Sequence, residues 1–173
     1  SRFRPGALDS LSMAAGMTTS LAPAPLRYLA GRLQELPGFD ALLAALKAGR
    51  EATLEGAWGS VCALSAAALL SQNPAPLLVV CPHGDDIDPF CDDLRLFSSV
   101  EPETFPAWET FRREQSITDE IFGDRLRLLK QLTGSSPPRC VVTSIQALLQ
   151  GVPSRQRLAT HGRVLSVGET LDL

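Results

Sequence analysis

The order of apolar and polar residues along the chain predicts short helices and strands that alternate. Residues 39–47 place apolar side chains at helical spacing and are followed by Gly49, so they predict a helix. Residues 61–70 are apolar and rich in alanine, which predicts a buried helix. Residues 77–81 read LLVVC between two prolines, a pattern that favours a strand covered on both faces.

The second half of the chain continues this alternation. Residues 116–119 fit a capping box, and the apolar positions that follow predict a helix that closes before Gly134. The other expected elements are an amphipathic run at 26–33, a short strand at 52–54, a helix at 86–97, strands at 100–105 and 140–143, a helix at 145–149, a connection at 151–162 and a final strand at 163–167.

Strands that alternate with helices over short connections predict an α/β fold, in which helices flank a parallel sheet. We place this domain at residues 26–150, because a chain of 173 residues favours one main domain. Residues 1–25 lack a clear period, and we expect an N-terminal tail that is disordered or loosely packed. Residues 151–173 are expected to form a connection and the start of a further domain.

The charge and composition argue against several classes of protein. The net charge is −3 and the pI is near 5.4, whereas proteins whose main role is to bind nucleic acid usually carry a basic face. No apolar run reaches the roughly 18 residues of a membrane span. The chain begins Ser-Arg-Phe-Arg-Pro and lacks the layout of a secretory signal. We therefore expect a cytoplasmic protein with no membrane partner.

The cysteines and histidines do not form a metal-binding pattern. The four cysteines are widely spaced without a C-x-x-C pair, and the two histidines are far apart in the sequence. We expect no metal ligands and interpret the cysteines as buried free thiols in a reducing compartment.

The stretch LEGAWGSVCALS at residues 54–65 begins like a phosphate-binding loop and then departs from it. The template G-x-x-x-x-G-K-[ST] needs a second glycine for close approach, a lysine to neutralise phosphates and a hydroxyl to hold Mg²⁺. Counted from Gly56, these three positions are occupied by Val61, Cys62 and Ala63. Only Gly56, Gly59 and Ser60 still match. We therefore expect a vestigial loop with no cofactor-binding and no catalytic residue.

The acidic stretch GDDIDPFCDD at residues 84–93 raises the possibility of a metal site. Its spacing does not match a calcium loop, which also needs a glycine at the sixth position. Carboxylates near the start of a helix are favoured by the helix dipole, and this explanation is preferred.

An aromatic stretch surrounds Trp108 and lies close to Arg112 and Arg113. Aromatic side chains beside basic ones can stack nucleic-acid bases. More often such a cluster belongs to the core, which is the preferred interpretation. Neither His83 nor His161 has the local context of a catalytic triad.

The order of motifs resembles one family. LPGFDALLAALKAG, LEGAWGS, LLVVCPHGDDIDPFCDDLRLF, FPAWETF, ITDEIFGDRLRLLKQL and VVTSIQALLQGVP together resemble the N-terminal, UvrB-like module of the bacterial transcription-repair coupling factor, Mfd. The resemblance runs from about Leu36 to the C-terminus. Its most specific residues are Trp108 and Glu109, then Asp119 and Glu120 with Arg125.

The resemblance implies a degenerate P-loop NTPase fold, similar to domain 1a of UvrB, without catalysis. UvrB has a complete phosphate loop, whereas the Mfd copy has lost its catalytic residues. UvrB also carries a long aromatic hairpin for damage inspection, and the short segment between Trp108 and Ser116 leaves no room for one. This chain is therefore expected not to be an enzyme.

The family also implies a role in a larger protein. Mfd recognises stalled RNA polymerase, displaces it with separate motor domains that use ATP and Mg²⁺ on DNA, and recruits UvrA. The UvrB-like region supports UvrA recruitment through the adjoining domain, contacts other domains of the same protein and restrains the motor. We expect RVLSVGETLDL to begin that adjoining domain and the chain to be a fragment.

Two other interpretations remain open at this stage. One is a UvrB-like or helicase-like domain that still binds ATP through a non-standard loop. The other is a stand-alone protein with a degenerate loop that uses the fold only for interactions. The missing lysine and hydroxyl residue count against the first of these.

Overall fold

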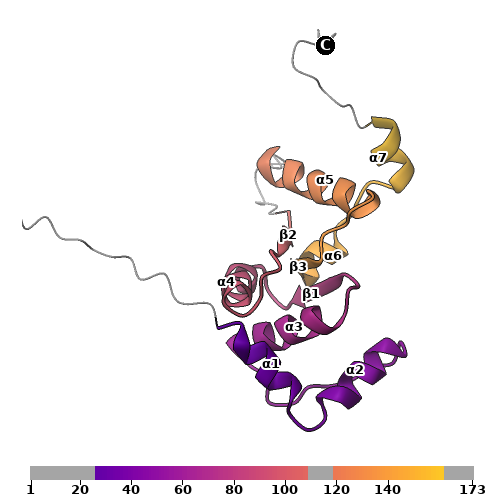
Figure 1. Ribbon diagram of the computed structural model, residues 1–173. Coiled ribbons are helices and arrows are strands. Elements are labelled where there is room, and N and C mark those ends of the chain that lie inside the picture. Colours follow the sequence, from indigo (N-terminus) through magenta and orange to yellow (C-terminus); the bar gives the residue numbers. More distant parts are fainter. Residues whose placement is uncertain (1–25, 109–118, 162–173) are drawn as a thin grey trace, which may run out of the picture.

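The structure, a computed structural model, describes residues 26–108 and 119–161 (Figure 1). Within these ranges the chain forms three strands, seven α-helices and one 3₁₀ helix. They are α1 (Tyr28–Gln34), α2 (Phe39–Lys47), α3 (Ser60–Gln72), β1 (Leu77–Cys81), η1 (Gly84–Asp86), α4 (Ile87–Phe97), β2 (Glu103–Phe105), α5 (Asp119–Thr133), β3 (Cys140–Ser144), α6 (Ile145–Leu149) and α7 (Arg155–His161).

The three strands form one parallel sheet in the order β1-β3-β2. Leu77 pairs with Cys140, and Glu103 pairs with Val141. The chain therefore passes from β1 to β2 through α4 and returns through α5 to the central strand. This arrangement confirms the predicted α/β class with a parallel sheet flanked by helices.

Helices cover the two faces of the sheet with separate groups of apolar side chains (Figure 1). One face packs against α3 and α4, with α1 packed on these two helices, and Ala63, Leu94 and Val142 are completely buried there. On the other face, Leu128 of α5 and Ala147 of α6 lie in one buried cluster with residues of β2 and β3. Because successive residues of a strand face opposite sides, β3 contributes to both groups and is buried along its whole length.

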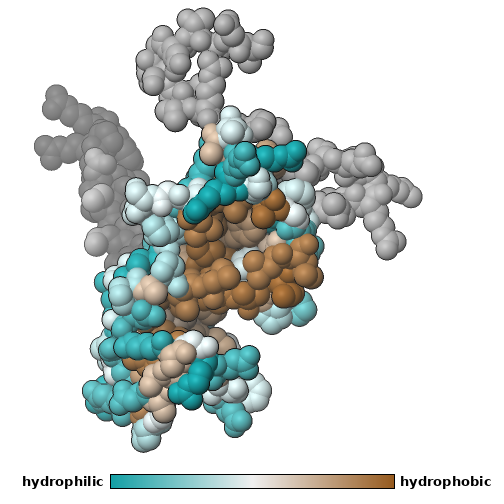
Figure 2. Space-filling model, turned by 90° about the vertical axis from the view of Figure 1, so that its right-hand side faces the viewer, coloured by the Kyte–Doolittle hydropathy of each residue, from teal (hydrophilic) through white to brown (hydrophobic). Residues whose placement is uncertain are grey.

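β1 is covered less completely than the sequence pattern predicts. Leu78 and Val80 are 55% and 42% exposed, while the alternate residues of the strand are partly or fully buried. The prediction of a strand covered on both faces is therefore wrong. The helix α5 packs against β2 but leaves this part of the sheet open. Figure 2 shows a hydrophobic area in the middle of one face of the molecule, and three residues of α6 are also exposed and apolar, namely Ile145, Leu148 and Leu149.

Two other predicted elements differ from the structure. Residues 52–54 form no strand and are exposed. A strand needs a hydrogen-bonded neighbour, and among the described residues β1, at the edge of the sheet, pairs with β3 and not with residues 52–54. Residues 151–162, predicted as a connection, contain the helix α7. The predicted final strand at 163–167 and the N-terminal tail lie outside the described residues, as does the predicted capping box at 116–119 except for Asp119, where α5 begins.

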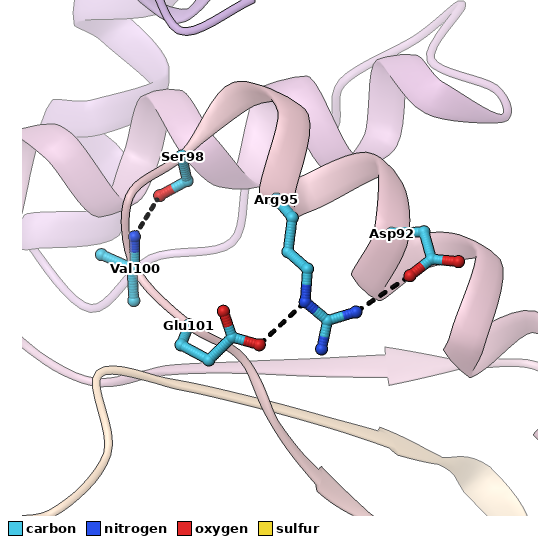
Figure 3. Close-up of polar contacts among 5 residues, drawn as sticks. All are labelled: Asp92, Arg95, Ser98, Val100 and Glu101. Carbon is cyan, nitrogen blue, oxygen red and sulfur yellow. Dashed lines mark hydrogen bonds and ion pairs between the residues drawn. The ribbon is translucent and has the colours of Figure 1, made fainter. Parts of the chain in front are cut away.

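The end of α4 is tied to the segment that leads into β2 (Figure 3). Arg95 donates from Nη1 to Asp92 at 2.9 Å and from Nε to Glu101 at 2.8 Å. Ser98 accepts a hydrogen bond from the backbone N–H of Val100 at 3.0 Å, in the turn between helix and strand. Because these groups are exposed, they orient the turn more than they stabilise the fold.

The four cysteines are free and fall into two classes. Cys81, Cys91 and Cys140 are buried, as predicted, whereas Cys62 is exposed and so differs from the prediction. Burial raises the pKa of the Cys91 and Cys140 thiols to about 11, because a thiolate loses its hydration inside the core.

Candidate functional site

The glycine turn before α3 has a backbone shape that favours glycine. Gly56 has a φ of 78°, and Gly59 combines a φ of 52° with a ψ of −132°. Ser60 then begins α3. Two of the backbone N–H groups in the first turn of this helix already have partners, because Val61 donates to the Trp58 carbonyl and Cys62 to the Gly59 carbonyl. They are therefore less available to an anion than the free N–H groups of a phosphate-binding turn.

The three residues that replace Gly-Lys-Thr lie in different surroundings. Val61 is 42% exposed, and Cys62 is exposed with its Sγ 3.5 Å from the Ala57 carbonyl oxygen. Ala63 is completely buried among the residues of the main core. A hydroxyl at position 63 would therefore enter the core in this arrangement and would not face a bound metal ion.

A cavity of about 360 Å³ opens between the glycine turn and β1. Gly59 and Cys62 line one side, and residues 79–82 line another. Asp86 and Asp93 contribute the charged groups of this cavity. Among the described residues that line it there is no lysine or arginine, so its electrostatic potential disfavours phosphate.

A second cavity of about 530 Å³ lies at the carboxyl ends of β1 and β2, the edge at which α/β sheets usually bind ligands. Asp85 and Asp88 line it together with His83, and the described lining again includes no lysine or arginine. Both cavities near the place where a phosphate loop would hold a nucleotide are therefore acidic.

At its start, the acidic stretch 84–93 makes a hydrogen bond to the neighbouring backbone. The side chain of Asp86 accepts a hydrogen bond from the backbone N–H of His83 at 3.2 Å, where η1 begins. Within residues 26–108 and 119–161, no group of three or more histidine, cysteine, aspartate or glutamate side chains is arranged to hold a metal ion. None of the described helices is both long and apolar enough to cross a membrane.

Trp108 and Arg125, two residues of the family resemblance, meet on the other side of the sheet. The guanidinium carbon of Arg125 lies 4.1 Å from the ring centre of Phe105 and 4.9 Å from that of Trp108. Arg125 is only 2% exposed, and its Nη1 donates to the Pro106 carbonyl at 2.6 Å. Its Nη2 has no hydrogen-bond partner, and burial lowers the pKa of the guanidinium.

Gln150 holds Trp108 in place and was not predicted from the sequence. Its Oε1 accepts a hydrogen bond from the Trp108 backbone N–H at 2.6 Å, and its Nε2 donates to the Trp108 carbonyl at 2.9 Å. The only signal for this contact in the sequence was that Gln150 falls within one of the motifs of the resemblance, VVTSIQALLQGVP.

The remaining residues of the resemblance are not brought together by the described contacts. Glu120 is exposed near the start of α5. Glu109 and the aromatic and basic residues up to Arg113 lie outside the described residues, and the side chain of Asp119 is not described. Phe105 is buried, which agrees with the interpretation of the aromatic stretch as part of the core.

The comparisons with known proteins do not identify a relative. No protein-family model matches the chain, and the search of curated proteins finds no match. The resemblance to transcription-repair coupling factors therefore rests on the sequence motifs alone.

Proposed function

We propose that this chain is a non-catalytic UvrB-homology module of a transcription-repair coupling factor. In this role it acts as a scaffold, held against other domains of the same protein, and needs no cofactor of its own. ATP, Mg²⁺, DNA and RNA polymerase are engaged by other parts of the parent protein. UvrA binds through the domain that adjoins this module.

The observation that carries the non-catalytic part of the proposal is the acidity of the two cavities near the glycine turn. A nucleoside triphosphate such as ATP carries three negatively charged phosphates, and a phosphate loop offsets this charge with a lysine and a metal ion. Here Asp85, Asp86, Asp88 and Asp93 line the cavities, and no lysine or arginine is among their described lining residues. A triphosphate in this position would meet carboxylates in place of cations.

The exposed apolar surface supports a scaffold role. Leu78 and Val80 expose apolar area in the sheet, and Leu149 is 81% exposed on α6. Apolar areas of this kind usually mark a contact with another protein or domain. A module that is covered by further domains of the parent protein accounts for them.

The test uses the full-length protein that carries this segment and a variant without residues 26–150. If the module restrains the motor, its removal raises the basal ATPase rate, while purified UvrA still binds both proteins through the adjoining domain. An unchanged ATPase rate would contradict the restraint. Failure of UvrA to bind the full-length protein would contradict the family assignment.

A further inference from the structure

The strand β1 has an open edge along one side. It is an outer strand of the sheet, and its neighbour among the described residues is β3. The N–H of Leu77 donates to the Arg139 carbonyl at 2.9 Å, and alternate residues of a strand turn to the same neighbour. The backbone groups of Leu78 and Val80 therefore turn away from β3, and no hydrogen bond between described residues satisfies them.

The sequence of this edge is short, apolar and uncharged. Residues 77–81 read LLVVC and are flanked by Pro76 and Pro82. Because proline has no N–H, the donors that face the open edge are those of Leu78 and Val80. Lysine, which often protects an edge strand from further pairing, is absent from residues 76–82. The prolines limit the length of a further ladder but leave the edge between them open.

The side chains beside this edge are exposed on the same face of the sheet as α6. Leu78 pairs with Val141, and Val141 lies in one buried cluster with Ala147 of α6. Paired residues of neighbouring strands point to the same face, so Leu78 and Val80 also lie on the α6 face. The two side chains are 55% and 42% exposed. The open edge is thus bordered by apolar side chains that water still reaches.

We propose that β1 pairs with β1 of a second copy of this chain. The two strands run antiparallel with their Val79 residues opposite each other, so that Leu78 of one copy lies opposite Val80 of the other. Each N–H on one edge then meets a carbonyl on the other, and the two apolar side chains form a cross-strand pair. The inference goes beyond the proposed function and does not depend on it.

A second copy fits this edge better than an unrelated strand, because the edge is complementary to itself. A register shifted by two residues would place Pro76 or Pro82 opposite one of the donor residues and lose a hydrogen bond. The absence of charge means that no like charges meet when identical strands pair about a twofold axis. Because the ladder is short, the association is weak and depends on protein concentration. In a longer protein, a domain that covers Leu78 and Val80 would compete with the second copy.

Sedimentation equilibrium of the full chain, from micromolar to millimolar concentration, measures this association. Leu78→Lys should weaken it roughly tenfold, because a charge then lies in the apolar pair on each side of the axis. Leu36→Lys is the matched control, since Leu36 is also 55% exposed but lies between α1 and α2. The control should associate like the unmodified chain. Circular dichroism shows whether both variants keep the fold.

A mixture of two variants tests the register. In the proposed pairing, the lysine of Leu78→Lys lies opposite the glutamate of Val80→Glu when one copy of each associates. The mixture should therefore associate more tightly than either variant alone. A chain that stays monomeric at millimolar concentration, an unaffected Leu78→Lys variant, an equal loss in Leu36→Lys, or no gain in the mixture would overturn the proposal. An unchanged ATPase rate after removal of residues 26–150 would contradict the proposed function without affecting this result.

Discussion

Replacing Ala63 by threonine restores the hydroxyl residue that a phosphate loop carries at this position, and we predict that it destabilises the fold. Ala63 is completely buried and packs in the core formed by α1, α3, α4 and one face of the sheet. Threonine adds a methyl and a hydroxyl group. In this environment both groups must displace neighbouring atoms of the core.

The magnitude follows from two costs. Overpacking a well-packed core costs about 1–3 kcal/mol. A buried hydroxyl without a good partner adds about 1–3 kcal/mol, which a hydrogen bond to the preceding helical turn reduces. We therefore expect Ala63→Thr to lower the free energy of unfolding by about 3 kcal/mol. For a chain of this size that corresponds to a fall in Tm of about 6–12 °C.

Urea denaturation followed by far-ultraviolet circular dichroism measures this change through the transition midpoint. Val61→Thr is the matched control, because Val61 lies in the first turn of the same helix and is 42% exposed. The control should shift the free energy of unfolding by no more than about 0.5 kcal/mol. If Ala63→Thr unfolds at the same urea concentration as the unmodified chain, position 63 does not lie in a tightly packed core, and the reasoning fails.

Three further predictions concern other parts of the fold. Because burial raises the pKa of the Cys91 and Cys140 thiols to about 11, the stability that they contribute should be complete below the ordinary thiol range and lost as the pH rises towards 11; urea midpoints that stay constant over this range would contradict the assignment. Arg125→Ala should lower the free energy of unfolding by about 2–4 kcal/mol through the lost hydrogen bond and ring stacking, and Arg125→Lys should recover only part of it; equal urea midpoints for all three proteins would refute this role. Val80→Lys should reduce light scattering at high protein concentration without lowering stability by more than about 0.5 kcal/mol, since Val80 is on an exposed part of an edge strand; unchanged scattering would argue against an adhesive surface there.

Elements with strong local signals could be predicted from the sequence. The helix Phe39–Lys47, the strand Leu77–Cys81 and the helix Ile145–Leu149 have the predicted bounds. Their apolar period and their flanking glycine, proline or capping residues depend only on neighbours in the sequence. The helix Arg155–His161 was missed because its residues are mostly polar and show no clear apolar face.

Features that depend on distant parts of the chain could not be predicted. Residues 52–54 have the composition of a strand, but nothing in a single sequence shows whether a neighbouring strand is present to pair with them. The exposure of Leu78 and Val80 likewise depends on where α5 packs. Local patterns therefore predict elements better than they predict which surfaces become covered.

The candidate sites show the same limit. The absence of Gly-Lys-Thr at positions 61–63 could be seen in the sequence, because the phosphate-loop template has fixed spacing. The contact between Trp108 and Gln150 joins residues 42 positions apart. A cavity of about 660 Å³ is lined by residues of α5 and of α7, and no motif in the sequence predicted that these two helices would meet.

The most direct test of the central claim is an equilibrium titration of this chain with a fluorescent ATP analogue, with and without Mg²⁺. The account predicts no saturable binding up to millimolar nucleotide, which means a binding free energy weaker than about 4 kcal/mol. The variant that carries both Val61→Gly and Cys62→Lys serves as a comparison, because it restores the glycine and the lysine and leaves Ala63 in the core. Micromolar, Mg²⁺-dependent binding by the unmodified chain would contradict the account and identify a nucleotide-binding domain that uses a non-standard loop.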